Sequence, residues 1–196
     1  MPTSTPSIRA FICIDIPPSL KTQIENLQNE LRRIDAQVSW VKPANIHLTI
    51  KFLGDMPTEK IPQVIEAARH VTGSCSPFQL EASGAGVFPS PQNPNVLWIG
   101  LNDLPDALIA LQQAIEDELS TIGIARESKN FNPHLTIGRI RNRRNARQLA
   151  EELIRRGKAS DRFTVTEIIV MRSDLDPRGA IYTPLAVLPL QPPTAI

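Results

Sequence analysis

Two of the three histidines in this 196-residue sequence stand in the same tetrapeptide, HLTI. One copy covers residues 47–50 and the other covers 134–137, an offset of 87 residues (134 minus 47). Histidine titrates near neutral pH, so one imidazole can act as a base while a second acts as an acid. The repeated tetrapeptide therefore suggests acid–base chemistry by a pair of histidines.

Residues two apart in an extended strand share a face. His47 and Thr49 therefore point the same way from one strand, as do His134 and Thr136 from another. If the two strands meet, these four side chains line one cleft. Displacement at phosphorus needs a base for the attacking water, an acid for the leaving oxygen and donors for the non-bridging oxygens. The set is suited to phosphoester hydrolysis without a metal or a cofactor, and either imidazole can be the acid.

Two other interpretations remain open. The histidines can be structural residues that were duplicated together with the fold, which is the ordinary meaning of a single HxT tripeptide. A zinc site is the second alternative, but His47 and His134 belong to no HExxH motif and have no clear carboxylate companion. Two copies in matching strand positions favour the catalytic interpretation, and we expect no metal site.

The flanking sequence predicts the elements that carry these residues, from runs with period 2 for strands and apolar stripes for helices. The first half predicts a strand at 9–16, a helix at 17–34, a strand at 45–53, a helix at 58–71 with Thr58 as N-cap, and an extended stretch at 78–88. The second half predicts a strand at 95–101, a helix with stripe residues from 108 to 122 after Asp103 or Asp106 as cap, strands at 134–140, 163–170 and 181–188, and a helix at 145–157 that ends at Gly157.

The two halves repeat the same order of elements. At the offset of 87, Phe11 falls on Trp98, and at an offset of 88 the helical stripe of the first half falls on that of the second. Internal duplication is the best explanation. We expect an α+β fold of two pseudo-symmetric lobes, each an antiparallel sheet with flanking helices, with the active-site cleft between them. The expected domain covers residues 8–190, with repeats at about 8–90 and 95–190 and flexible ends at 1–7 and 191–196.

Composition places the chain among globular proteins, with 41% hydrophobic and 21% charged residues. A formal net charge of +1 gives no overall attraction to nucleic acid or membrane, so an anionic ligand must be held by local geometry. The two cysteines show no disulfide or zinc spacing, and no apolar run is long enough to span a membrane. We expect a cytoplasmic monomer that does not bind membranes.

The segments "WVKPANIHLTIKFLGDM" (40–56) and "FNPHLTIGRIRN" (131–142) resemble the paired HxTx motifs of the 2H phosphoesterase superfamily. They are most similar to those of the RNA 2',3'-cyclic phosphodiesterases, historically called 2'-5' RNA ligases. "FICIDIP", "GAGVFPSPQNPNVLWIGL" and "LDPRGAIYTPLAVLPL" resemble further segments of that family in the same order.

This resemblance implies hydrolysis of an RNA terminal 2',3'-cyclic phosphate to a 2'-phosphate. It implies His47 as proton donor to the leaving 3'-oxygen and His134 as proton acceptor from water, with Thr49 and Thr136 as substrate-binding residues. The expected substrates are RNA ends with a cyclic phosphate, tRNA fragments among them, or cyclic nucleotides. Two alternatives stay open: 2'-5' ligation of RNA halves by the reverse transesterification, for which the chain has no KxDG motif, and a catalytically silent module that binds RNA ends.

Arg139 stands where the family carries an arginine and is a candidate phosphate ligand. Strand parity places it with Leu135 and Ile137, away from the histidine, unless a bulge at Gly138 intervenes. The arginine-rich run 139–147 is either a solvated loop and helix start or a landing surface for RNA phosphates.

Other side chains have weaker claims to the site. Lys42 and Lys51 either add to the landing surface or are ordinary surface lysines, and His70 has no expected catalytic role. Four aromatic residues either pack in the core or stack on a base, namely Trp40, Phe88, Trp98 and Tyr182.

Overall fold

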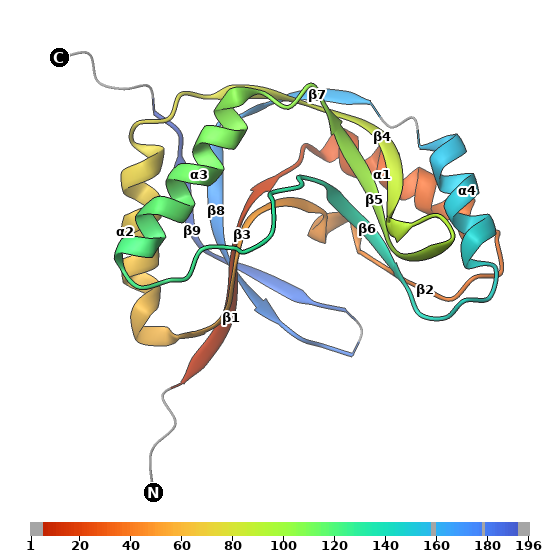
Figure 1. The fold of residues 1–196 in the computed structure, drawn as a ribbon, viewed down its shortest axis with the longest axis horizontal. Coiled ribbons are helices and arrows are strands. Elements are labelled where there is room, and N and C mark those ends of the chain that lie inside the picture. The colour runs from red at the N-terminus through yellow and green to blue at the C-terminus, as the bar shows by residue number, and fades with distance from the viewer. Residues whose placement is uncertain (1–5, 158–159, 178, 192–196) are drawn as a thin grey trace, which may run out of the picture.

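The computed structural model describes residues 6–157, 160–177 and 179–191, and Figure 1 shows their arrangement. The first half contains β1 (Ser7–Asp15), α1 (Pro18–Leu31), β2 (Val38–Trp40), the short 3-10 helix η1 (Pro43–Asn45), β3 (His47–Pro57), a second 3-10 helix η2 (Thr58–Lys60), α2 (Ile61–Thr72) and β4 (Phe78–Ser90). The second half contains β5 (Asn93–Asn102), α3 (Asp106–Thr121), β6 (Leu135–Ile140), α4 (Ala146–Arg156), β7 (Asp161–Val165), β8 (Glu167–Asp174) and β9 (Ile181–Pro189).

The described strands form one continuous antiparallel sheet with two arms. Its order is β7-β4-β5-β6-β3-β1-β8-β9, and β2 pairs with β6 beside this path. The arms join where β3 meets β6, and that junction contains a single residue pair, Leu48 with Leu135. Helices α2 and α3 pack together on one arm, whereas α1 and α4 pack together on the other (Figure 1). This arrangement confirms the predicted α+β fold with two lobes of antiparallel sheet and flanking helices.

The lobes do not coincide with the two halves of the sequence. The first lobe consists of β3, β1, β8 and β9 with α2 and α3, and the second lobe consists of β7, β4, β5, β6 and β2 with α1 and α4. Helix α1 from the first half therefore packs beside α4 from the second half, and α3 packs beside α2 (Figure 1). Because each half gives elements to both lobes, neither half can bury its apolar surface alone.

The helical stripes behave as their spacing predicts. Leu20, Ile24 and Leu31 of α1 are buried, and so are Leu108 and Leu119 of α3. The sheet covers the apolar stripe of each helix, because burying one aliphatic side chain stabilises the fold by about 1.5–3 kcal/mol. Helix α4 ends at Gly157, as predicted, and the Gly157 N–H donates to the carbonyl of Leu153.

Several boundaries differ from the sequence-based expectations, among them the start of α3, whose N-cap is Pro105 and not Asp103 or Asp106. Thr58 is not the cap of α2, because it opens η2 and its hydroxyl donates to the carbonyl of Pro6, while α2 begins at Ile61. The single strand predicted at 163–170 is wrong, because the chain divides at Thr166 into β7, which pairs with β4, and β8, which pairs with β1. Strand β1 begins at Ser7, inside the range expected to be a flexible end. Pro6 and Gln191, in the same expected ends, make backbone hydrogen bonds with Thr58 and Thr72, whereas residues 1–5 and 192–196 lie outside the described residues.

No helix in the described part of the chain is long and apolar enough to cross a membrane.

The junction between the arms yields a first prediction. Replacing Leu48 by Ala should lower the free energy of unfolding by about 2–5 kcal/mol, because it removes a buried side chain at the one β3–β6 pair that the described residues form. The matched control is Leu104→Ala, at a residue that is 42% exposed, which should change stability by less than about 0.5 kcal/mol. Urea unfolding measures both, and equal losses would contradict the role given to the junction.

Candidate active site

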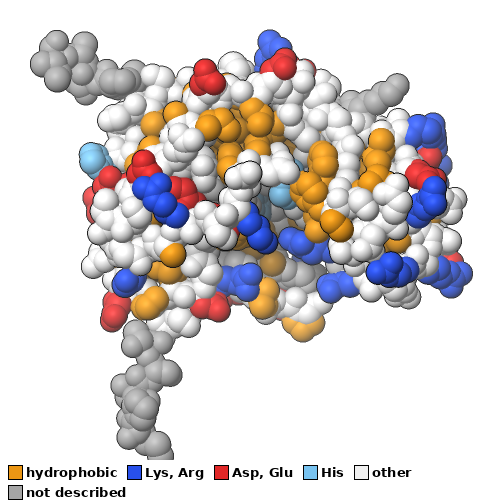
Figure 2. All heavy atoms as spheres, in the orientation of Figure 1, with side chains coloured by type: hydrophobic (Ala, Val, Ile, Leu, Met, Phe, Trp, Pro, Cys, Tyr) orange, Lys and Arg blue, Asp and Glu red, His pale blue; other side chains and the backbone are white. Residues whose placement is uncertain are grey.

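A cleft of about 660 Å³ opens between the two lobes, and every site residue predicted from the sequence lines it. These residues are His47, Thr49, His134, Thr136 and Arg139. Figure 2 shows this hollowed face, with histidine atoms visible in the hollow and Lys and Arg side chains along its lower rim. The remaining lining residues come from the segment before β3, from β3 itself, from α3, from the segment before β6, and from the aromatic side chains Phe52, Phe88, Phe131 and Tyr182.

The junction of the arms brings the two motifs together. Leu48 and Leu135 are paired antiparallel and both are buried, so the residues on either side of each leucine point to the opposite, cleft-facing side. The antiparallel direction places His47 on the same side of this pair as Thr136, and His134 on the same side as Thr49. Each imidazole therefore lies across from the hydroxyl of the other motif.

Both motif strands carry a bulge at the same repeat position. In the pairing of β1 with β3, Ile12 lies opposite Lys51 and Cys13 opposite Thr49, which leaves Ile50 without an opposite residue. In the pairing of β5 with β6, the register likewise skips Ile137. The last residue of HLTI is thus a bulge residue in both copies, and a bulge of one residue reverses which face the following side chains occupy.

The bulge explains why Arg139 reaches the cleft although strand parity placed it with Leu135 and Ile137. Its counterpart in the first motif, Phe52, lines the same cleft and is 60% exposed. Gly138, the residue suspected from the sequence, does lie directly after the bulge residue. The structure therefore puts a cation on one side of the cleft and an aromatic ring at the equivalent place on the other.

Lys51 corrects an expectation from the sequence, because it is not a surface lysine. The same bulge turns it inward, so that it is only 4% exposed, and its Nζ donates to Glu116 Oε2 at 2.7 Å. Sequence periodicity alone cannot reveal this burial, because lysine on a strand is almost always solvated.

Backbone carbonyls fix the orientation of both imidazoles. His47 Nδ1 lies 2.8 Å from the carbonyl oxygen of Asn45, and His134 Nδ1 lies 2.7 Å from that of Asn132. A carbonyl can only accept, so Nδ1 carries the proton and donates in each ring, and Nε2 is left as the reactive nitrogen. The two asparagines are themselves 87 residues apart, a signal that could have been found by extending the repeat to NxHLTI.

The two imidazoles have different surroundings. His47 stacks on Phe11, with ring centroids 4.7 Å apart, and meets the edge of Tyr182. Burial lowers the pKa of His47 below its ordinary value of 6.5, against the Asn45 carbonyl, which raises it. His134 meets the edge of Phe88 at 5.0 Å. The two repeats therefore differ in the aromatic side chains that pack around the histidine ring.

Hydroxyl groups complete the polar set. Thr49 Oγ1 lies 3.1 Å from His47 Nε2 and can donate its single proton to that nitrogen while the ring is neutral. Protonation of Nε2 removes this acceptor, and the hydroxyl can then donate to an anion instead. Thr136 lines the cleft from the other strand. Burial raises the pKa of the Tyr182 hydroxyl, against Arg139, whose charge lowers it, so this phenol stays protonated and can donate.

Of the aromatic candidates from the sequence, Phe88 and Tyr182 line the cleft. Trp40 lies beneath the Arg32 guanidinium and Trp98 packs against Phe88, so these two serve mainly in packing. His70 pairs with Glu118 and is not among the residues that line the cleft.

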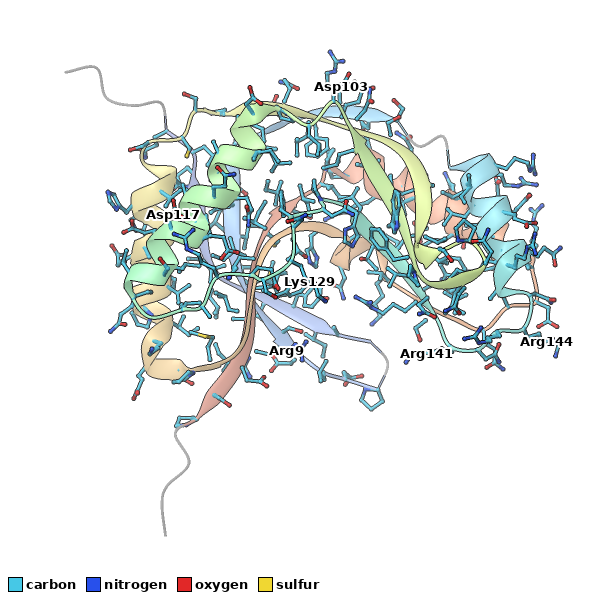
Figure 3. All side chains as sticks on the ribbon, viewed as in Figure 1. Arg9, Asp103, Asp117, Lys129, Arg141 and Arg144 are labelled. Carbon is cyan, nitrogen blue, oxygen red and sulfur yellow. The ribbon has the colours of Figure 1, made fainter. Side chains whose placement is uncertain are left out.

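The arginine-rich run is partly neutralised by acidic residues. Arg144 pairs with Asp35, and Arg147 pairs with Glu151. Arg141 donates to the Ser39 hydroxyl, a neutral partner. Figure 3 shows Arg141 and Arg144 on the loop between β6 and α4, and Lys129 at the cleft. For Arg144 and Arg147 the structure supports the solvated-loop interpretation.

Among the described residues, no group of three or more His, Cys, Asp or Glu side chains is placed to hold a metal ion.

A bilobal α+β fold with paired HxT strands is that of a 2H phosphoesterase. A family model described as "LigT like Phosphoesterase" matches residues 14–98 and again 99–182, one match for each repeat. The chain therefore belongs to the LigT-like phosphoesterase family.

Similar proteins support the same family. The chain is 36% identical to a protein of Methanothermobacter thermautotrophicus named "RNA 2',3'-cyclic phosphodiesterase", over 93% of this chain and 99% of the relative. It is 32% identical to a protein of the same name from Aquifex aeolicus, over 90% and 94%. These relatives confirm the resemblance found in the motifs and the prediction that the chain is an enzyme of this family.

Solved structures share the fold at lower identity. The structure of the Thermus thermophilus protein TT0787 matches with a TM-score of 0.78 at 22% identity, covering 94% of this chain and 99% of that one. Escherichia coli LigT complexed with 3'-AMP matches with a TM-score of 0.72 at 22% identity and the same coverage.

The lowered pKa of His47 predicts a loss of stability in acid. The folded protein takes up a proton at His47 less readily than the unfolded chain, so this contribution is fully present above about pH 6.5 and is lost as pH falls through the lowered folded pKa. Urea unfolding at about pH 7.5 and about pH 5 should show a larger loss for the wild type than for His47→Gln. Equal losses in the two proteins would contradict the lowered pKa.

Proposed function

We propose that this protein hydrolyses the terminal 2',3'-cyclic phosphate of RNA to a 2'-phosphate, using His47 and His134 as the acid–base pair. The observation that carries the proposal is the single β3–β6 junction, because it aims both HxT pairs into one cleft. The names of the curated relatives support the choice of substrate.

The reaction follows from the reactive Nε2 atoms. One imidazole, neutral at Nε2, removes a proton from water as its oxygen attacks phosphorus, and the P–O3' bond breaks. The other imidazole, protonated at Nε2, gives its proton to the leaving 3'-oxygen. The product keeps its phosphate on the 2'-oxygen. The first ring ends protonated and the second neutral, and exchange with solvent restores the starting state.

The surrounding side chains stabilise charge on the phosphoryl group. The hydroxyls of Thr49 and Thr136 donate to non-bridging oxygens, and the Arg139 guanidinium binds them as a fixed cation. The carbonyls of Asn45 and Asn132 hold each ring by its Nδ1–H, so neither Nε2 turns away during the reaction.

Family analogy assigns the acid to His47 and the base to His134, and the packing around His47 by itself opposes the first assignment. Burial lowers the pKa of His47, which favours its neutral form. An anionic phosphate beside the ring has the opposite effect, because a nearby negative charge favours the imidazolium. We infer that His47 takes up its proton when substrate binds.

The walls of the cleft fit a nucleoside end. Phe52 and Tyr182 offer aromatic surface for a base at the first lobe, whereas Arg139 and Lys129 offer charge for phosphates. A reaction independent of metal, a cytoplasmic location and a monomeric state complete the proposal.

Removing either imidazole tests the function. His47→Ala and His134→Ala should each lower kcat by about 10²- to 10⁴-fold on RNA that ends in a 2',3'-cyclic phosphate, since each removes a proton-transfer group. His70→Ala is the control and should retain full activity. EDTA should leave the wild-type rate unchanged, and the product should carry a 2'-phosphate. Full activity in either histidine variant, or inactivation of the wild type by EDTA, would contradict the proposed mechanism.

A substrate with sulfur in place of the bridging 3'-oxygen separates the acid from the base. A leaving thiolate needs little protonation, because thiols have a pKa of about 8.5, far below that of an alcohol. The defect of His47→Ala should therefore shrink strongly on this substrate, while that of His134→Ala should persist. The reverse pattern would exchange the two roles.

A further inference from the structure

Two buried polar side chains, one on each of two equivalent helices, hold the segments that lead into the histidines. Gln28 of α1 is 1% exposed, and its Nε2 donates to the carbonyl oxygens of Val41 and Ile137, both at 2.9 Å. Val41 precedes His47 by six residues, whereas Ile137 belongs to β6, the strand of the other motif. We call this group the α1 clamp.

The second group lies at α3. Glu116 is 7% exposed, and its Oε2 accepts from Lys51 Nζ at 2.7 Å and from the Glu127 backbone N–H at 3.1 Å. Lys51 Nζ also donates to the carbonyl of Ala125 at 2.8 Å. Glu127 precedes His134 by seven residues, whereas Lys51 belongs to β3, the strand of the first motif. We call this group the α3 clamp.

The internal repeat relates the two clamps. Gln28 falls on Glu116 at the helical offset of 88 found in the sequence, so the same position of the duplicated helix is polar in both copies. In each lobe the helix ties the incoming segment of one histidine to the strand that carries the other histidine. The segment between α3 and β6 passes from the first lobe to the second in Figure 1. Its hydrogen bonds to Lys51 of β3 and to Glu116 therefore link the two lobes.

Packing alone does not require these residues. A buried amide or ion pair must be fully hydrogen-bonded to offset its desolvation, and an apolar side chain of similar volume often serves the core as well or better. The polar choice instead fixes direction, because each clamp makes hydrogen bonds to particular backbone groups: the carbonyls of Val41 and Ile137 in one, and the carbonyl of Ala125 and the N–H of Glu127 in the other. The groups it fixes lie just before Asn45 and Asn132, whose carbonyls orient the two imidazoles.

We propose that Gln28 and the Lys51–Glu116 pair are positioning residues that set the separation and orientation of the two imidazoles. The proposal rests on the proposed function, in which both rings act on one phosphate. Neither clamp donates a proton to the substrate or takes one from it. Each acts through the backbone that presents a histidine, and displacement of a reacting group by about 1 Å can cost on the order of 10²-fold in rate.

The test removes each clamp separately and keeps the core filled. The variants are Gln28→Met for the α1 clamp and the double variant Lys51→Met with Glu116→Met for the α3 clamp, in which no buried charge is left without its partner. The matched controls are Leu20→Ala and Leu108→Ala, both fully buried on the same two helices and outside the clamps. Neither residue takes part in the clamp hydrogen bonds, so these variants measure the effect of lost stability alone.

Kinetics on cyclic-phosphate RNA, at a temperature where all the variants are folded, give the first readout. Each clamp variant should lose about 10- to 100-fold in kcat with KM changed much less, because ground-state binding tolerates a displacement that the transition state does not. The leucine controls should lower the unfolding midpoint and keep kcat. Loss of kcat that is equal in controls and clamp variants, or no loss in the clamp variants, would overturn the proposal.

A second readout does not need activity. Inorganic phosphate titrated into the wild type should shift the NMR signals of the His47 and His134 rings together, with one Kd, and each clamp variant should weaken that Kd or separate the two responses. If the wild type hydrolyses no cyclic phosphate, the proposed function fails. The phosphate titration still tests whether the clamps position the two histidine rings. If both clamp variants bind phosphate with the wild-type Kd, and the signals of the two rings still shift together, the inference is overturned. The two clamps are tested independently. If the variant of one clamp does not fold, the variant of the other clamp still tests the proposal.

Discussion

The pairing of Leu48 with Leu135 is the contact on which the site depends. Among the described residues it is the only residue pair between β3 and β6, and it joins the two arms of the sheet at the boundary between the two lobes. Both leucines are buried, so their neighbours must face the cleft. A slip of one residue at this junction would move the histidines to the core face and the leucines to solvent, and burial of the leucines opposes such a slip.

The scaffold is nearly symmetric, but the site is not. Phe52 and Arg139 occupy equivalent positions, one an exposed ring and the other a cation. Phe11 stacks on His47, whereas its counterpart Trp98 lies 6.5 Å from His134 and at a steep angle. Such inequality lets the surroundings of each ring influence which imidazole is protonated and which is neutral, the division of roles that acid–base catalysis uses. Duplication supplies the pair, and later divergence of the neighbours distinguishes its members.

Much of the site could be predicted from the sequence, because its signals are local. Two HLTI copies, period 2 in strands and the match between helical stripes were enough to place His47, Thr49, His134 and Thr136 in one cleft. The bulge at Ile50 escaped prediction, and the bulge at Ile137 was raised only as a possibility through its neighbour Gly138, since isoleucine itself gives no sign of irregular pairing. For the same reason the sequence left Arg139 undecided and mistook Lys51 for a surface residue. The exchange of elements between halves and lobes also escaped, because periodicity identifies a strand but not its neighbour, as the division at Thr166 shows.

A crystal structure with a nucleoside 2'-phosphate bound tests the central claim most directly. The account predicts that Nε2 of His47 and Nε2 of His134 both lie about 3 Å from oxygens of the same phosphate group, with the hydroxyls of Thr49 and Thr136 beside its remaining oxygens. A phosphate held by one imidazole only, with the other ring turned away or too distant for a hydrogen bond, would contradict it.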